Sequence, residues 1–132
     1  MAHVLEHIDK NKIIDTLKAI KDNLLNEGGK FIVMVPNAQS NTDAYWMYED
    51  FTHATLFTAG SMLYVLKAAG FTNVQFLDPD GTEFLQPHKK VIIKMLMWWY
   101  KKKKDFWNSV TQSSYHKPSP RIHTFELKVL AQ

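Results

Sequence analysis

The sequence predicts an α/β fold in which helices alternate with the strands of a parallel sheet. Three observations predict it: an amphipathic helical pattern precedes a short continuous apolar run, that pair repeats once, and an alternating segment closes the chain. Continuous apolar runs are typical of strands buried on both faces of a parallel sheet. Alternation of helix and strand favours the same architecture.

The first helix and strand occupy the N-terminal quarter. Apolar residues recur at spacings of three, four and seven between Ile8 and Leu25, which is the period of an amphipathic helix. Gly28 and Gly29 are suited to end it. The run from Phe31 to Val35 is then predicted to be a strand buried on both faces.

The second helix and strand follow a long loop. Residues 37–56 are polar and aromatic without a clear period, and a loop of this length inside a compact domain is usually functional. Thr58 is suited to cap a helix over residues 59–69, and Gly70 to end it. Residues 71–77 are predicted to form the second strand.

The C-terminal third contains one more helix and a closing strand. Residues 88–107 predict a helix with a broad apolar face, and residues 109–120 a polar loop with two prolines. Residues 122–130 alternate between apolar and polar side chains, which predicts a final, antiparallel strand.

Length and composition narrow the classes of protein. The 132 residues suit a single domain, and 45% hydrophobic with 22% charged residues is a globular composition. No apolar stretch approaches the roughly 18 residues of a membrane span, and no secretory signal pattern is visible. A cytoplasmic location is therefore expected, with contact at the inner face of a membrane as a variant. The lack of cysteine excludes disulfides and thiolate metal sites.

The charge is unevenly distributed. Residues 1–86 carry a net charge of −5. Residues 87–121 carry +8, because they contain nine lysines and arginines and a single acidic residue, Asp105. The overall charge of +3 therefore reflects one basic segment. Such a segment indicates what that part of the chain contacts and says little about the fold.

Five short segments occur in an informative order. They are Val4–Ile8 (VLEHI), Leu24–Pro36 (LLNEGGKFIVMVP), Thr58–Phe71 (ending LKAAGF), Val74–Phe76 and Phe125–Leu130. In this order they resemble the segment that follows the fourth strand, the fifth strand, its following helix, and the sixth and antiparallel seventh strands of class I S-adenosylmethionine-dependent methyltransferases. The resemblance spans nearly the whole chain and implies the C-terminal half of a Rossmann-like sheet.

The same resemblance implies S-adenosylmethionine as cofactor, with part of its site absent. In that family the first strand ends in a glycine-rich loop and the second in an acid that binds the ribose, and neither motif occurs in this sequence. Activity would then need a second copy of the chain or a separately made N-terminal half. A sheet cut through its middle also exposes a strand edge that favours pairing with another chain, so a homo-oligomer is expected.

Candidate cofactor and metal residues follow the position of the fourth strand. The resemblance implies that His3, Leu5 and Glu6 contact the cofactor. Glu6 and His7, together with His53 of the long loop, resemble the carboxylate–imidazole set with which some family members hold a divalent metal. His3 stands where that pattern has a second glutamate. Alternatively, Glu6 caps the following helix and His7 packs against it.

The candidate catalytic base lies in the segment Asp50-Phe-Thr-His53. This segment resembles methyltransferases that act on polysaccharides and other glycan-linked substrates. An oxygen nucleophile benefits from a base that takes its proton, and histidine titrates near neutrality. His53 is therefore the candidate base and Asp50 the residue that orients it. Alternatively, the two residues attach the loop to the next helix.

Further candidate substrate-binding residues border the same expected site. They are Pro36, Asn37, Tyr45, Trp46 and Tyr48. Aromatic side chains there could stack on a sugar or shield the methyl group, or they could simply cover the sheet. The resemblance implies O-methylation of a small-molecule, sugar or glycan-linked acceptor, as in polysaccharide biosynthesis.

Residues 87–121 form a basic, aromatic insertion with several interpretations. Two tryptophans and a tyrosine precede Lys101–Lys104, a pattern that suits a membrane surface or a lipid carrier. Nucleic acid is the weaker alternative. An ordinary helix that buries Trp98 and Trp99 also explains the pattern. For the whole chain, the competing hypothesis is a non-catalytic half-domain that self-associates or binds a membrane through this helix.

Overall fold

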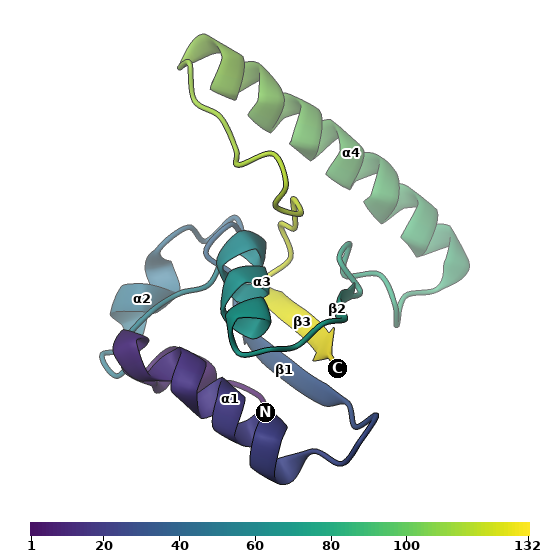
Figure 1. Ribbon diagram of the computed structural model, residues 1–132. Coiled ribbons are helices and arrows are strands. Elements are labelled where there is room, and N and C mark those ends of the chain that lie inside the picture. The colour runs from purple at the N-terminus through teal and green to yellow at the C-terminus, as the bar shows by residue number, and fades with distance from the viewer.

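The helices and strands follow the predicted order. The computed structural model describes residues 1–132 (Figure 1). In chain order the elements are η1 (Leu5–His7), η2 (Lys10–Lys12), α1 (Ile13–Leu24), β1 (Phe31–Pro36), α2 (Tyr45–Glu49), α3 (Ala59–Ala68), β2 (Val74–Leu77), α4 (Pro87–Val110) and β3 (Glu126–Ala131). The α/β class, the long basic helix and the antiparallel final strand are confirmed.

The three strands form one sheet in the order β1-β3-β2. β3 runs antiparallel to both neighbours, and its Val129 pairs with Val33 on one side and Phe76 on the other. β1 and β2 therefore run parallel to each other, as predicted, and the predicted antiparallel strand, β3, lies between them. Ala2 forms a parallel bridge with Met34, so the first residues of the chain cover part of the other edge of β1.

The core lies on one face of the sheet, beneath α1 and α3 (Figure 1). Val33, Val129, Leu17, Met62 and Leu66 are all fully buried there. Burial of such side chains is the main favourable term that holds the two helices on the sheet, at about 1.5–3 kcal/mol for each large one.

The opposite face of the sheet is only partly covered, so the prediction that residues 31–35 are buried on both faces is wrong. Ile32 is 48% exposed. In Figure 1 α4 projects away from the sheet, so it does not cover this face.

Several boundaries differ from the predicted ones. α1 begins at Ile13 and not at Ile8, because residues 5–7 and 10–12 form short 3-10 helices. α2 interrupts the predicted loop over residues 37–56. β2 begins at Val74, because Phe71 turns into the core, where it is 2% exposed.

The N-terminus of α3 is held by a reciprocal capping box. The amide of Ser61 donates to Thr58 Oγ1 at 3.2 Å, and the amide of Thr58 donates to Ser61 Oγ at 2.9 Å. Two amide donors that the helix leaves free are thereby satisfied. The predicted cap at Thr58 is confirmed.

The long connections leave from one edge of the sheet, which is the edge at which β1 and β2 end. Pro36 at the end of β1 pairs with Glu126 at the start of β3, and Leu77 at the end of β2 pairs with Lys128. The loop after β1 and the segment that leads to α4 both leave from this edge. Ligands of open α/β sheets bind outside the carboxyl ends of their parallel strands, which is this edge.

Candidate functional site

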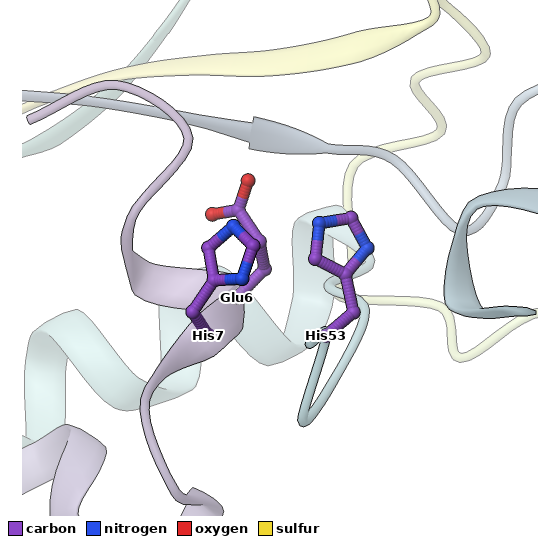
Figure 2. A group of neighbouring side chains, drawn as sticks. All are labelled: Glu6, His7 and His53. Atoms are coloured by element: carbon purple, nitrogen blue, oxygen red, sulfur yellow. The ribbon is translucent and has the colours of Figure 1, made fainter. Parts of the chain in front are cut away.

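Glu6, His7 and His53 lie together although they are distant in sequence (Figure 2). One potential ligand atom from each side chain lies within 4.8 Å of the others, and the two imidazole centroids are 4.6 Å apart. Glu6 and His7 belong to η1, and His53 to the loop between α2 and α3. The structure thus brings the three predicted metal ligands into one cluster.

Backbone hydrogen bonds position this loop against η1. The amides of Ala54 and Thr55 both donate to the carbonyl oxygen of Glu6, at 2.8 and 3.2 Å. The residue just before these two amides is His53. Its place beside Glu6 is therefore set by main-chain contacts and does not depend on the identity of the side chain.

Hydrogen bonds assign the proton on each imidazole. Nδ1 of His53 lies 2.7 Å from the carbonyl oxygen of Trp46, which can only accept, so Nδ1 carries the proton and Nε2 has a free lone pair. Thr52 Oγ1 donates to Asp50 at 2.6 Å and lies 2.8 Å from Nδ1 of His7. Because the hydroxyl has one proton, His7 donates to it, and in its neutral form each of the two histidines has the free lone pair on Nε2.

Asp50 contributes charge near the histidines. Its carboxylate accepts from the hydroxyl and the amide of Thr52, and these bonds lower the pKa of Asp50 below its ordinary value of 3.8, helped by His53 and His7. Its Oδ2 lies 3.7 Å from Nε2 of His53, which is too long for a hydrogen bond. The direct orienting contact of His53 is therefore the carbonyl of Trp46.

Glu6 is the most unusual group of the cluster. Its side chain is fully buried, and neither carboxylate oxygen has a hydrogen-bond partner, so it caps no helix. The nearest imidazole is that of His3, whose Nδ1 is 3.4 Å from Glu6 and whose Nε2 is 3.3 Å from Glu126. An unpartnered buried carboxylate is costly unless a cation meets it. Carboxylate and imidazole are suitable ligands for a divalent metal.

Asn37 lies inside the protein. It is 2% exposed, and its amide nitrogen donates to the carbonyls of Ile122 and Thr124, both at 2.9 Å. Its side-chain oxygen accepts from the amide of Gln39 at 2.9 Å. These bonds attach the start of the loop to the segment before β3 and leave little capacity for a substrate. Pro36 is buried as well.

The three aromatic candidates on α2 divide into two groups. Tyr45 and Tyr48 are 51% and 82% exposed and are free to contact a ligand. The ring of Trp46 packs edge-on against Phe125, with centroids 5.3 Å apart, and covers the approach to β3.

A second polar cluster was not predicted from the sequence. His123 is 7% exposed, its Nδ1 bonds to the carbonyl of Gln39 at 3.1 Å, and its Nε2 has no partner. Burial lowers the pKa of His123 below 6.5. Together with Asn41 and Tyr100 it borders a cavity of about 380 Å³ against α4. The only sequence signal was a histidine in an alternating segment.

Comparisons with known proteins concern the family and the fold. Residues 1–76 match the family model described as a methyltransferase domain. The structure of a SAM-dependent methyltransferase from Archaeoglobus fulgidus is similar, with a TM-score of 0.58 and 14% identity over 99% of this chain and 56% of that one. The chain thus spans little more than half the length of that relative, and the likeness concerns the fold. None of the curated proteins matches.

Proposed function

The chain belongs to the methyltransferase domain family, and on that premise we propose that it takes part in methyl transfer from S-adenosylmethionine to an oxygen acceptor. One observation carries the proposal: His53 presents a free Nε2 beside the buried, unpartnered carboxylate of Glu6. Both lie next to the edge of the sheet from which the long connections leave. A candidate base and an anionic group for a positively charged cofactor are thereby combined in one place.

The residues have distinct roles in the proposed reaction. The cofactor supplies the methyl group, whose bond to oxygen forms as its bond to sulfur breaks, and the acceptor must lose a proton. Nε2 of His53 takes that proton, while the bond from Nδ1 to Trp46 fixes the ring. The charge of Asp50 stabilises the resulting imidazolium. Glu6 is assigned to the cationic part of the cofactor, whereas Leu5 is fully buried, backbone included, and packs in the core.

We propose a sugar or glycan-linked molecule as the acceptor. Tyr45 and Tyr48 support this because their exposed rings stand on α2, within the same loop as His53. Aromatic rings with a polar edge offer both an apolar face for a sugar ring and a hydrogen-bond partner.

A divalent metal at Glu6, His7 and His53 is the second candidate. The clustered ligand atoms, the two free Nε2 atoms and the unpartnered carboxylate support it. A bound ion would acidify the acceptor hydroxyl. Because one lone pair of His53 cannot both bind an ion and accept a proton, the two roles of His53 are alternatives. Calorimetric titration with Mg²⁺, Mn²⁺ or Zn²⁺ separates them: heat that His53→Ala abolishes supports the metal, and no heat excludes it.

The proposed reaction is tested by the rate of S-adenosylhomocysteine formation with a set of glycan acceptors. We expect His53→Ala to lower this rate by about 10²- to 10⁴-fold, because general-base catalysis contributes that much. His116→Ala is the control, since His116 is exposed in the loop after α4 and bonds only to Ser119. Equal rates for both variants would refute the role of His53.

A further inference from the structure

α4 presents a long, uncovered helix face. None of its 24 residues is buried, and Figure 1 shows that it projects from the rest of the protein. The polar contacts that attach it are Tyr100 with Asn41, Lys101 with Asp80, and Asp105 with Arg121. These contacts use one side of the helix and leave the other side without a partner.

The uncovered side is apolar. Ile92, Trp99, Phe106 and Val110 recur at spacings of four and seven, so they share one face, and each is at least 50% exposed. Leu96 lies at the border of this face, where it lines the cavity beside His123. Ile93, Met97 and Tyr100, which are less exposed, occupy the opposite side. The expectation that the helix buries Trp98 and Trp99 is therefore wrong: they are 53% and 61% exposed.

The charge of α4 selects among possible partners. The helix carries seven lysines and a single acidic residue, Asp105. Lys103 lies on this face between Trp99 and Phe106, and Lys102 borders it, so both would repel the same residues of a second copy. An anionic surface complements these charges, and lysines at the border of an apolar face extend toward phosphate groups.

We propose that the outward face of α4 lies on the surface of a membrane that contains anionic lipids. Aromatic and aliphatic side chains on one face with lysines around them are the pattern of helices that lie in the plane of a bilayer surface. No helix of the structure combines the length and apolarity that crossing a bilayer needs. The mode of contact is therefore insertion of one helix face.

The position of α4 would bring the edge of the sheet beside Glu6, His7 and His53 close to a membrane to which α4 is bound. The connection from β2 to α4 leaves the sheet at the edge beside which Glu6, His7 and His53 gather. A lipid-bound α4 would hold that edge near the membrane, where a lipid-linked acceptor could reach it. Lipid binding itself does not depend on methyl transfer, so the two can fail separately.

Vesicle flotation tests the proposal directly. We expect the chain to float with vesicles of phosphatidylcholine and phosphatidylglycerol, and much less with phosphatidylcholine alone or at high salt. Tryptophan emission should shift to the blue on binding, because three of the four tryptophans are on α4.

Variants localise the contact to α4. Trp99→Glu and Phe106→Glu should each weaken binding by about tenfold or more, since each removes an aromatic ring from the lipid. Tyr64→Glu is the matched control, because Tyr64 is an equally exposed aromatic residue on α3.

Four results would overturn the proposal. The first is no flotation with anionic vesicles at low salt. The second is an equal loss of binding in Tyr64→Glu. The third is a dimer in light scattering that Phe106→Glu dissociates while vesicles have no effect, which would assign the face to a second copy. Binding of an oligonucleotide in preference to anionic vesicles would also contradict the lipid assignment.

Discussion

The substitution Glu6→Gln distinguishes a ligand site from a structural site. Glu6 is fully buried, its oxygens have no hydrogen-bond partner, and the nearest imidazole, that of His3, lies 3.4 Å away. If a buried residue stabilises the fold, changing it lowers the free energy of unfolding of the protein. A buried charge retained for a ligand is expected to gain stability when it is neutralised.

The expected change in the free energy of unfolding follows from the cost of burying Glu6 without a hydrogen-bond partner. A buried polar group without a hydrogen bond costs about 1–3 kcal/mol, and a charged one costs more. Glutamine keeps the volume of Glu6 and removes the charge, although its amide is still unpartnered. We therefore expect Glu6→Gln to raise the free energy of unfolding by about 1–3 kcal/mol. For a domain of this size, that corresponds to a rise in melting temperature of about 3–12 °C.

Urea denaturation followed by circular dichroism measures this change, with a chelator present to exclude bound metal. Glu126→Gln is the matched control, because Glu126 has ionic partners in His3 and Lys128, at 3.3 and 3.5 Å. That variant should be neutral or less stable by up to about 1 kcal/mol. If Glu6→Gln lowers the stability by 1 kcal/mol or more, Glu6 is a structural residue and the reasoning fails.

Three further predictions concern the surroundings of the site. Asn37→Ala should cost about 3 kcal/mol in urea denaturation, since one buried and two partly buried hydrogen bonds are lost; the exposed control Asn23→Ala should cost less than about 0.5 kcal/mol, and equal costs would contradict the attachment role of Asn37. Thr58→Ala should destabilise by about 1–2 kcal/mol, because the capping box is lost, and an unchanged urea midpoint would count against it. Burial holds the pKa of His123 below 6.5, so the folded state is favoured while the ring is neutral and loses stability as the pH falls below 6.5, where the unfolded chain binds the proton first. In His123→Phe the urea midpoint should fall less steeply between about pH 6.5 and pH 5, and an unchanged slope would remove His123 from this account.

The order of the helices and strands could be predicted because it depends on local periodicity. The alternation in the last segment placed Leu127 and Val129 on one side of a strand, and both are buried as that pattern requires. The prediction that the run Phe31–Val35 is buried on both faces is wrong because it, too, depends on local pattern alone. An apolar run does not reveal which element covers each side, and the side of Ile32 has no helix over it.

The site was predictable only at the level of residue types. The resemblance pointed to Glu6, His7 and His53, and the structure brings them together. The orientation of His53 by a main-chain carbonyl, and the bridge of Thr52 between His7 and Asp50, depend on the path of the loop. The short helix α2 sets that path, and its five residues are too few for a periodic signal.

Calorimetric titration with S-adenosylmethionine, using the chain and its Glu6→Gln variant, is the most direct test of the central claim. We predict saturable binding that S-adenosylhomocysteine competes with, and weaker binding by Glu6→Gln even though that variant is the more stable protein. Absence of binding, or equal affinity of the two proteins, would contradict the assignment of Glu6 and its neighbours to the site of the methyl donor.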